Sequence, residues 1–242
     1  MTLNQLKLSL FVIVILATTT LKAQNIFVGG GGGGGTFGMN SVKEFNQTII
    51  KQLPFNPVLK DNFPPYIFYN GEVIDSLTEN LAVGINLSTT STGSRHSLAD
   101  YSGHYTFDNI QKGFFPGIKI FYGAESGCLN EFNLLIEGGV SFSNMIINEE
   151  LKIFEEFQSD KMELEAMGFF FQPGICYFKN ITPRIKVCAN ISYYFGFEKG
   201  YYLPKEKNQI LYNQETGKPI KPQWDGIRLG ITAYWMLPHE SK

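Results

Sequence analysis

Charged residues are scarce in this chain of 242 residues. Asp, Glu, Lys and Arg make up 17% of it, against roughly 25% in typical soluble domains. The formal net charge is -2, so the composition indicates neither a nucleic-acid partner nor a polybasic contact with a membrane surface. The deficit suits a protein with much of its surface in lipid, although a compact enzyme can also show it.

Long apolar runs are absent after the N-terminus, which excludes a transmembrane helix in the rest of the chain. At the N-terminus, Lys7 precedes an apolar run over 8–17, and a short polar stretch leads to Ala23. This order is typical of a secretory signal peptide, so we predict a signal peptide over 1–23 that is cleaved after Ala23. The alternative is an uncleaved anchor, for which the run is too short. The mature domain is then 24–242, and it can cross a membrane only as strands.

Residues that commonly carry catalysis or bind metals are also few. The chain has three histidines and three cysteines, and it contains neither an HExxH nor a GxSxG motif. Asp100, Ser102 and His104 fall two residues apart on one predicted strand and are weak catalytic candidates. Same-face neighbours on a strand lie roughly 7 Å apart, which is loose for a catalytic triad. We therefore expect a polar lumen face here, and neither a metal ion nor a cofactor.

Alternation of apolar and polar residues is the strongest positive signal, because it places alternate side chains on opposite faces of a strand. It is clear from residues 81, 132, 185 and 227 onward, and weaker segments bring the total to eight strands. The predicted strands are 25–38, 80–91, 95–108, 114–124, 131–146, 166–178, 185–198 and 223–236. We predict an all-β fold, an antiparallel transmembrane β-barrel of eight strands. The alternative is a secreted barrel or sandwich.

The predicted connections differ in length between the two ends of this barrel. Those at one end are all short, whereas three of the four at the other end are long. The short ones are 92–94, 126–130 and 179–184, and the others are 39–79, 109–113, 147–165 and 199–222. Outer-membrane barrels have short periplasmic turns and longer outer loops. We therefore predict that the apolar positions face lipid and that both chain ends lie on the periplasmic side.

Aromatic residues near the predicted strand ends support the same orientation, because membrane barrels have aromatic girdles at both interfaces. Phe132 and Phe142 bracket one strand, and Trp224 and Trp235 bracket the last one. A soluble barrel would turn its apolar residues inward and would have no reason to place aromatics at its strand ends.

Two of the long connections have features of their own. In the first, Val42, Phe45, Ile49 and Leu53 share one face of a predicted short helix, which caps the barrel mouth or lies at the lipid interface. The connection 147–165 carries seven acidic residues and two lysines. Its spacing matches no EF-hand, so we predict a solvated acidic helix or loop.

Four charged residues fall on the predicted lumen face: Lys119, Glu137, Lys186 and Arg228. The interior of an eight-stranded barrel is just wide enough for side chains to fill. Buried charges must be paired, so we expect these four to form a lumen charge network and not to line a pore.

The hairpin around residue 182 suggests a disulfide. Counted from that turn, Cys176 and Cys188 are equally distant and should lie opposite each other on the lumen face. Directly opposite strand residues have Cα separations of about 4.5–5.5 Å, which is within disulfide range. We predict either this bridge or two buried thiols, with Cys128 unpaired.

Seven consecutive glycines at 29–35 match a dinucleotide fingerprint only trivially, because a P-loop would need Lys and then Ser or Thr after the last glycine. Thr36 and Phe37 follow instead. We interpret the run as a flexible first strand, or more specifically as a strip that makes room for bulky lumen side chains.

Several short segments resemble a known family. They are AQNIFV at 23–28 with the glycine run behind it, GMN at 38–40, STGSR at 91–95, DYSG at 100–103 and GIRLG at 226–230. In these the chain is similar to outer-membrane β-barrel proteins of Bacteroidetes-type bacteria. The resemblance implies an outer-membrane location and a barrel fold, and it implies no substrate.

The leading functional hypothesis is a non-enzymatic outer-membrane barrel with a structural or surface-interaction role. It would be a monomer in outer-membrane lipid, and its long outer loops would contact lipopolysaccharide or surface ligands. One alternative is an outer-membrane lipid-modifying enzyme that uses Asp100, Ser102 and His104. Another is a barrel that binds a small hydrophobic ligand or solute.

Overall fold

The computed structural model describes residues 26–101, 103–123, 129–205 and 209–237. Its elements are β1 (Ile26–Gly35), α2 (Asn40–Lys51), β2 (Val58–Asn62), β3 (Tyr66–Ser76), β4 (Leu81–Ala99), β5 (Gly103–Tyr122), β6 (Glu131–Ile153), β7 (Glu156–Thr182), β8 (Ile185–Glu198) and β9 (Gly226–Met236). The predicted signal peptide and Cys128 lie outside the described residues. In the part of the chain that is described, no helix is long and apolar enough to cross a membrane.

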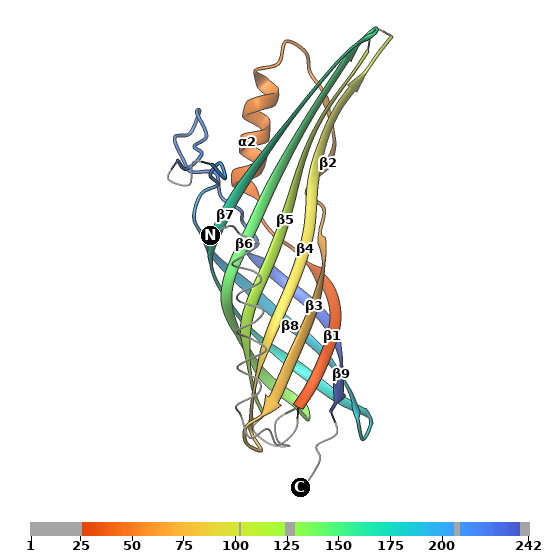
Figure 1. Ribbon diagram of the computed structural model, residues 1–242, viewed down its shortest axis with the longest axis vertical. Helices are drawn as coiled ribbons and strands as arrows, with labels where there is room; N and C mark the ends of the chain where they lie inside the picture. The colour runs from red at the N-terminus through yellow and green to blue at the C-terminus, as the bar shows by residue number, and fades with distance from the viewer. Residues whose placement is uncertain (1–25, 102, 124–128, 206–208, 238–242) are drawn as a thin grey trace.

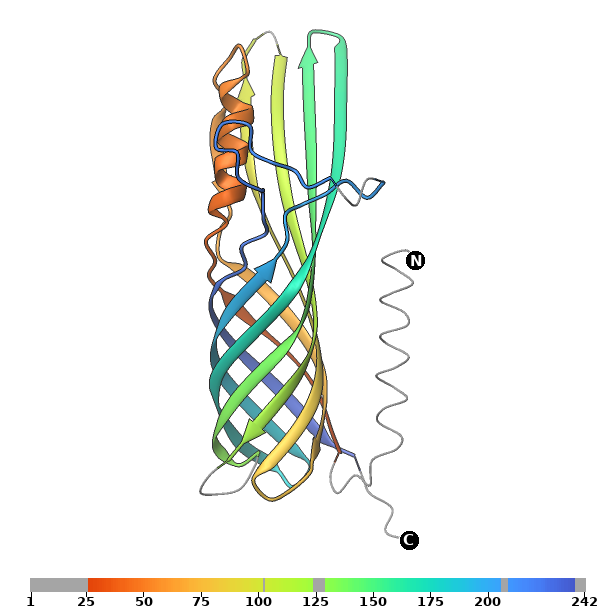
Figure 2. The same ribbon diagram turned by 90° about the vertical axis from the view of Figure 1, so that its left-hand side faces the viewer.

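Eight of the strands form a closed antiparallel barrel (Figures 1 and 2). Their order is β4-β3-β1-β9-β8-β7-β6-β5, and the pairing of β4 with β5 closes the ring. β2 stays outside the ring and pairs with β4 alone. The predicted all-β barrel is therefore confirmed, as is the short helix in the first long connection.

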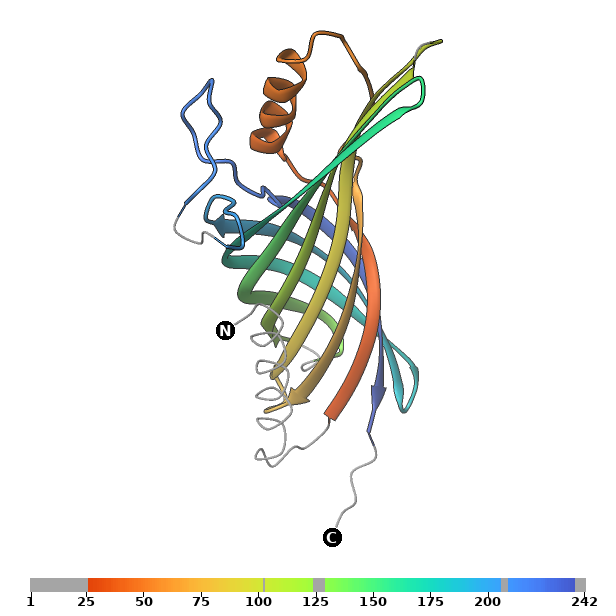
Figure 3. The same ribbon diagram turned by 45° about the horizontal axis from the view of Figure 1, so that its top comes forward.

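Four strands continue past the upper end of the ring in Figure 1. β3 pairs with β4 only as far as Ser91, and β8 pairs with β7 only as far as Gly168. Above these points β4, β5, β6 and β7 stay paired with one another, and β2 adds to the free edge of β4 (Figure 3). We call this five-stranded extension the projecting sheet. It consists of β2 and residues 92–99, 103–110, 146–153 and 156–164.

The predicted strand boundaries were wrong in two places, although the total of eight ring strands was right. β3 lies inside the segment 39–79, which was predicted as a long loop. Its Asn70-Gly71 pair is of a type that commonly forms hairpin turns, but here it stands in mid-strand, with Gly71 opposite Gly30. The predicted turn at 92–94 lies inside β4, and β4 turns into β5 only after Ala99. The predicted strand 95–108 is therefore divided between β4 and β5.

The two long connections lie at the upper end, as predicted, but the β4–β5 and β6–β7 connections at that end are short. Residues 77–80 and 183–184 are the lower turns, whereas the β1–β3 and β8–β9 connections are long and lie at the upper end. β1 begins and β9 ends at the lower rim, with Phe27 opposite Met236. The segment 147–165 is not the predicted acidic helix or loop. It is a long β6–β7 hairpin whose acidic residues lie on strands, except for Glu155 in the turn.

The outer face of the barrel is an apolar belt between two aromatic bands. The lower band is Tyr122, Phe132, Tyr177 and Trp235, and the upper band is Tyr69, Phe169, Phe195 and Phe197, all exposed. Exposed aliphatic residues lie between them: Ile118, Ile120, Leu134, Ile136, Ile175, Ile191, Leu229 and Ile231. Among the described strands, the outward positions between the bands carry no Asp, Glu, Lys or Arg.

The interior has the opposite polarity at many positions. Asn86, Ser88, Gln172, Ser192 and Thr232 are buried and point inward. The alternation therefore predicted the facing of these strands correctly. Trp224 was assigned wrongly to the aromatic girdle: it is fully buried inside the upper end of the barrel, where its Nε1 donates a hydrogen bond of 2.9 Å to Ser143 Oγ.

The glycine run forms most of β1 and does make room for lumen side chains. A Cβ on Gly29 would lie 2.6 Å from the ring of Tyr234, and one on Gly35 would lie 2.5 Å from the ring of Tyr66. Both tyrosines are buried. Gly30 and Gly34 point outward, where a Cβ would meet nothing closer than 3.8 Å.

Adjacent glycines of β1 are accordingly expected to tolerate alanine differently. Gly35→Ala should destabilise the barrel by about 1–3 kcal/mol, the usual cost of overpacking, because Tyr66 is held in place by Arg228 and stacks on Phe37. The matched variant Gly34→Ala should change stability by less than about 0.5 kcal/mol. Urea titration of each variant in lipid vesicles measures the difference, and equal effects would contradict the inferred facing of β1.

Candidate functional site

The lower half of the lumen contains a buried charge cluster. Lys119 Nζ on β5 lies 2.8 Å from Glu72 Oε2 on β3 and 3.8 Å from Glu137 Oε2 on β6. Both carboxylates accept further hydrogen bonds: Glu72 from Tyr234 Oη at 2.7 Å, and Glu137 from Asn86 Nδ2 at 2.7 Å. Together with Asn86 on β4 and Tyr234 on β9, the cluster cross-links five strands of the ring from the inside.

The structure brings together only part of the predicted lumen network. Lys119 and Glu137 are neighbours, whereas Lys186 lies near the lower rim and donates to the Leu129 carbonyl at 2.9 Å. Arg228 belongs to a separate cluster above. Glu72 was missed because β3 was read as a loop, although the alternation of Glu72, Val73 and Ile74 could have revealed an inward carboxylate.

Arg228 lies in an aromatic cage at the next level of the lumen. Its Cζ is 4.1 Å from the ring centre of Tyr194 and 4.9 Å from that of Phe115. It also donates to Tyr66 Oη at 2.6 Å and to Gln172 Oε1 at 3.1 Å. Because β9 and β5 are opposite each other in the ring, the contact of Arg228 with Phe115 spans the lumen.

Conductance is therefore expected to be small or absent. Side chains from opposite walls meet at Arg228, and the buried rings of Phe115, Phe170, Tyr194 and Trp224 pack together above it. An eight-stranded barrel leaves little further space. Planar-bilayer recordings of the purified protein check this, and stable, large, water-filled channels would contradict it.

The two described cysteines do not lie opposite each other as predicted. Cys176 pairs with Asn190, and Cys188 pairs with Phe178. The hairpin turns at 183–184, with a one-residue irregularity between Asn180 and Thr182. Its pairing is centred one residue later than predicted, so the partner of Cys176 lies two residues beyond Cys188. No bond joins Cys176 to Cys188 in the structure, and both side chains are buried.

The mouth of the barrel is closed by α2 and the described parts of the β8–β9 connection (Figure 3). A chain of hydrogen bonds ties them to the projecting sheet. Asn46 of α2 donates to Ser94 Oγ and accepts from Asn109 Nδ2, each at 2.7 Å. Gln111 links Asn109 to Tyr201 of the connection. These groups are buried, so the hydrogen bonds fix the helix in one position. The predicted apolar face of the helix packs here as a cap.

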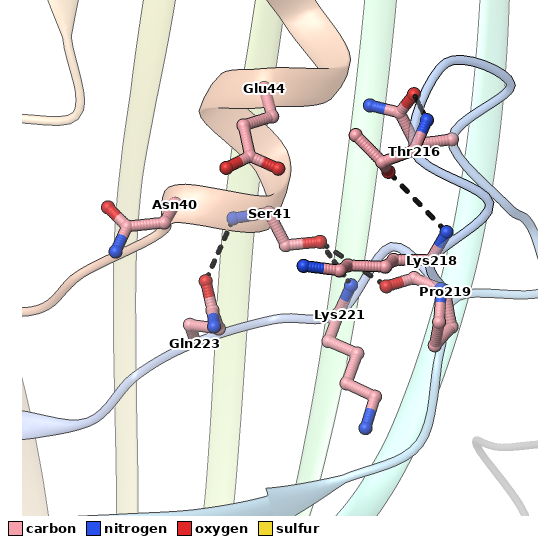
Figure 4. A pocket seen from close by; sticks show the side chains of 9 residues that line it. Asn40, Ser41, Glu44, Thr216, Lys218, Pro219, Lys221 and Gln223 are labelled. Atoms are coloured by element: carbon pink, nitrogen blue, oxygen red, sulfur yellow. Dashed lines mark hydrogen bonds between the residues drawn. The ribbon is translucent and has the colours of Figure 1, made fainter.

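A small hollow lies between α2 and the β8–β9 connection (Figure 4). It has a volume of about 290 Å³, and its lining includes Ser41, Glu44, Lys218 and Lys221. Ser41 N donates to Gln223 Oε1 at 2.9 Å, which satisfies one amide at the helix start. Charges of both signs line the hollow, so its composition favours no particular ligand charge.

The projecting sheet has two different faces. Its inner face, toward α2, carries apolar residues such as Leu98, Tyr105 and Leu151. Its outer face carries charged pairs, including Arg95, which makes two hydrogen bonds of 2.6 and 2.7 Å to Asp108 on the neighbouring strand. The sheet is thus braced by the helix on one side and by the Arg95–Asp108 ion pair between β4 and β5 on the other.

The catalytic candidates do not form the predicted row on one strand. Asp100 lies in the turn between β4 and β5, where its Oδ1 accepts a hydrogen bond from Gly103 N at 3.1 Å. His104 follows on β5, opposite Ala99 and Lys152. Ser102 lies outside the described residues. The turn at the tip of the projecting sheet, which the sequence did not predict, accounts for the error.

The docking of β2 is expected to depend on pH through His96. Its ring is buried beside Phe107 and its residue pairs with Leu59 of β2. Burial lowers the pKa of this imidazole, so the docked form favours neutral histidine and loses stability as the pH falls below about 6.5. The protection factors of the β2 amides, which are corrected for the intrinsic pH dependence of hydrogen exchange, are therefore expected to be lower at pH 5 than at pH 7.5.

The control for this prediction is the other histidine of the same sheet. His96→Leu should remove the pH dependence of the protection factors in β2, whereas His104→Leu at the tip should leave it unchanged. An unchanged pH profile in His96→Leu would show that another group is responsible.

Within the described ranges, no three His, Cys, Asp or Glu residues are grouped so that they could hold a metal ion.

Comparison with known proteins gave structural neighbours alone. No family model and no curated protein matches the chain. The crystal structure of Ail, the attachment invasion locus protein of Yersinia pestis, is 10% identical with a TM-score of 0.40, over 88% of this chain and 97% of that chain. The structure of Ail in complex with the heparin analogue sucrose octasulfate is 11% identical in sequence, with a TM-score of 0.40 and the same coverage of both chains. The crystal structure of the N-terminal β-barrel domain of Pseudomonas aeruginosa OprF is 10% identical in sequence with a TM-score of 0.30, over 89% of this chain and 100% of that chain.

Proposed function

We propose that this chain is a non-enzymatic outer-membrane β-barrel that holds the projecting sheet outside the cell for contacts with surface partners. The observation that carries the proposal is the uncharged apolar belt around a closed barrel with buried charges inside it. A closed barrel is one of the two structures that can satisfy all backbone hydrogen bonds within lipid.

The direction of insertion follows from the two ends of the barrel. The lower end has tight turns, such as 183–184, and the upper end has the long connections and the projecting sheet. Outer-membrane barrels place short turns in the periplasm and long connections outside. The surface role rests on the projecting sheet, since its strands continue well beyond the upper aromatic band. The lumen is packed, and of the residues that suggested an enzyme, Asp100 lies in a turn and His104 lies on β5.

Localisation and orientation can be tested in one experiment with a matched pair of insertions. An epitope placed between Phe154 and Glu155 at the tip should be labelled on intact cells. The same epitope at 183–184 should be labelled only after permeabilisation. Membrane fractionation and heat-modifiable gel mobility report insertion independently. Labelling of both sites on intact cells, or recovery in the soluble fraction, would refute the proposal.

A further inference from the structure

The two edges of the projecting sheet are built differently. β2 covers the β4 edge and is short, with a register shift between Leu59 and Asp61 and with Lys60 at that shift. Short length, bulges and lysines are the usual devices that prevent an edge from pairing further. The β7 edge runs regularly from Glu156 to Leu164, without glycine, proline or a register shift.

Backbone groups of β7 are available along this edge. Glu165 exchanges two hydrogen bonds of 2.9 Å with Tyr202, on the side away from β6. Because successive residues of a strand point their N–H and C=O groups to opposite sides, every second residue above Glu165 also faces away from β6. These residues are Phe157, Ser159, Lys161 and Glu163. Lys161 N donates to the side chain of Asp160 at 2.8 Å, and the pairing of β7 with β8 does not extend to this stretch.

The side chains along the edge favour one kind of partner. Residues 156–165 carry four carboxylates, Glu156, Asp160, Glu163 and Glu165, and one lysine. A hollow of about 390 Å³ adjoins the edge, lined by Leu151, Ile153, Glu156, Phe157 and Gln158. Its apolar walls and single carboxylate suit the aliphatic stem and charged end of a lysine or arginine side chain.

We infer that the β7 edge, Glu156–Leu164, binds an extended cationic peptide segment of a partner protein as an added antiparallel strand. This inference rests on the proposed function, because it needs the projecting sheet to lie outside the cell. Main-chain hydrogen bonds supply affinity in such strand addition, and alternate side chains supply specificity. A second copy of this chain is the weaker occupant, because it would bring the same net negative charge to the edge.

Three labelled peptides test the inference on the full-length protein in detergent micelles. The first alternates lysine and valine over ten residues, the second is the same peptide N-methylated at every peptide bond, and the third has glutamate in place of lysine. Fluorescence anisotropy should detect binding of the first peptide alone. Hydrogen exchange should show new protection at Ser159, Lys161 and Glu163. Equal binding of the methylated or the acidic peptide would overturn the inference.

Variants of the edge sharpen this test. Ser159→Pro removes an edge-facing N–H without breaking the β6 ladder, and it should weaken binding about tenfold, whereas Ser159→Thr should bind normally. The double variant E156Q/D160N should weaken binding and reduce its salt dependence. Asp61→Asn, on β2 at the opposite edge of the projecting sheet, should do neither. If Ser159→Pro binds as the wild type does, strand addition at β7 is wrong.

Two further results separate this inference from the proposed function. If the protein inserts with the predicted orientation but binds none of the peptides, the inference fails and the proposed function stands. Sedimentation of the protein alone should show a monomer. A dimer that Ser159→Pro dissociates would identify a second copy as the occupant and would overturn the cationic partner.

Discussion

Leu229→Arg is expected to destabilise the inserted barrel by about 2–4 kcal/mol, the cost of arginine on the lipid face near the bilayer midplane. Leu229 is 56% exposed on β9 and pairs with Ile191, which lies between the two aromatic bands. In water this side chain could be replaced at little cost, so a large effect depends on lipid around the belt. Equilibrium unfolding in urea with phospholipid vesicles, followed by tryptophan fluorescence, measures the change.

The matched control is an exposed leucine outside the belt. Leu59 on β2 is 44% exposed, and Leu59→Arg should change stability by less than about 0.5 kcal/mol because the projecting sheet lies in water. Equal destabilisation at the two positions would mean that the apolar belt does not face lipid, and the barrel would have to be a soluble one.

The sequence predicted strands well where apolar and polar residues alternate between different environments. β8 has the bounds that the alternation predicted, and β6 begins at the predicted residue. The inward and outward sets were correct because lipid and lumen select opposite residue types at every second position. Trp224 was misplaced because proximity to a strand end does not show toward which side a side chain points.

Two parts of the fold could not be predicted in this way. β3 contains Asn70-Gly71, whose local preference for a turn is overridden by pairing on both sides. The projecting sheet has water on one face and α2 on the other, so its alternation is weaker than that of the belt. For this reason β2 and residues 147–164 were read as loops, whereas 95–108 was predicted as a strand. The predicted lumen charge network was incomplete as a consequence, because Glu72 lies on β3, the strand that was missed.

Lys119→Met is expected to have the largest effect inside the barrel, about 3–5 kcal/mol, because it leaves the carboxylates of Glu72 and Glu137 buried without their cation. Both carboxylates are almost fully buried, as is Lys119. The control is Lys51→Met, which breaks the exposed pair with Glu215 at 3.4 Å and should cost less than about 1 kcal/mol. Urea unfolding in vesicles compares the two.

Rescue distinguishes unpaired charge from lost packing as the cause of this effect. Adding Glu72→Gln and Glu137→Gln to Lys119→Met removes both buried charges and keeps the oxygens that accept hydrogen bonds from Tyr234 and Asn86. If electrostatics dominates, the triple variant should recover most of the lost stability, because neutral groups of the same shape avoid the desolvation cost of isolated ions. If the triple variant is as unstable as Lys119→Met, the lysine acts through the packing of its aliphatic stem, and the charge cluster is not what holds the five strands together.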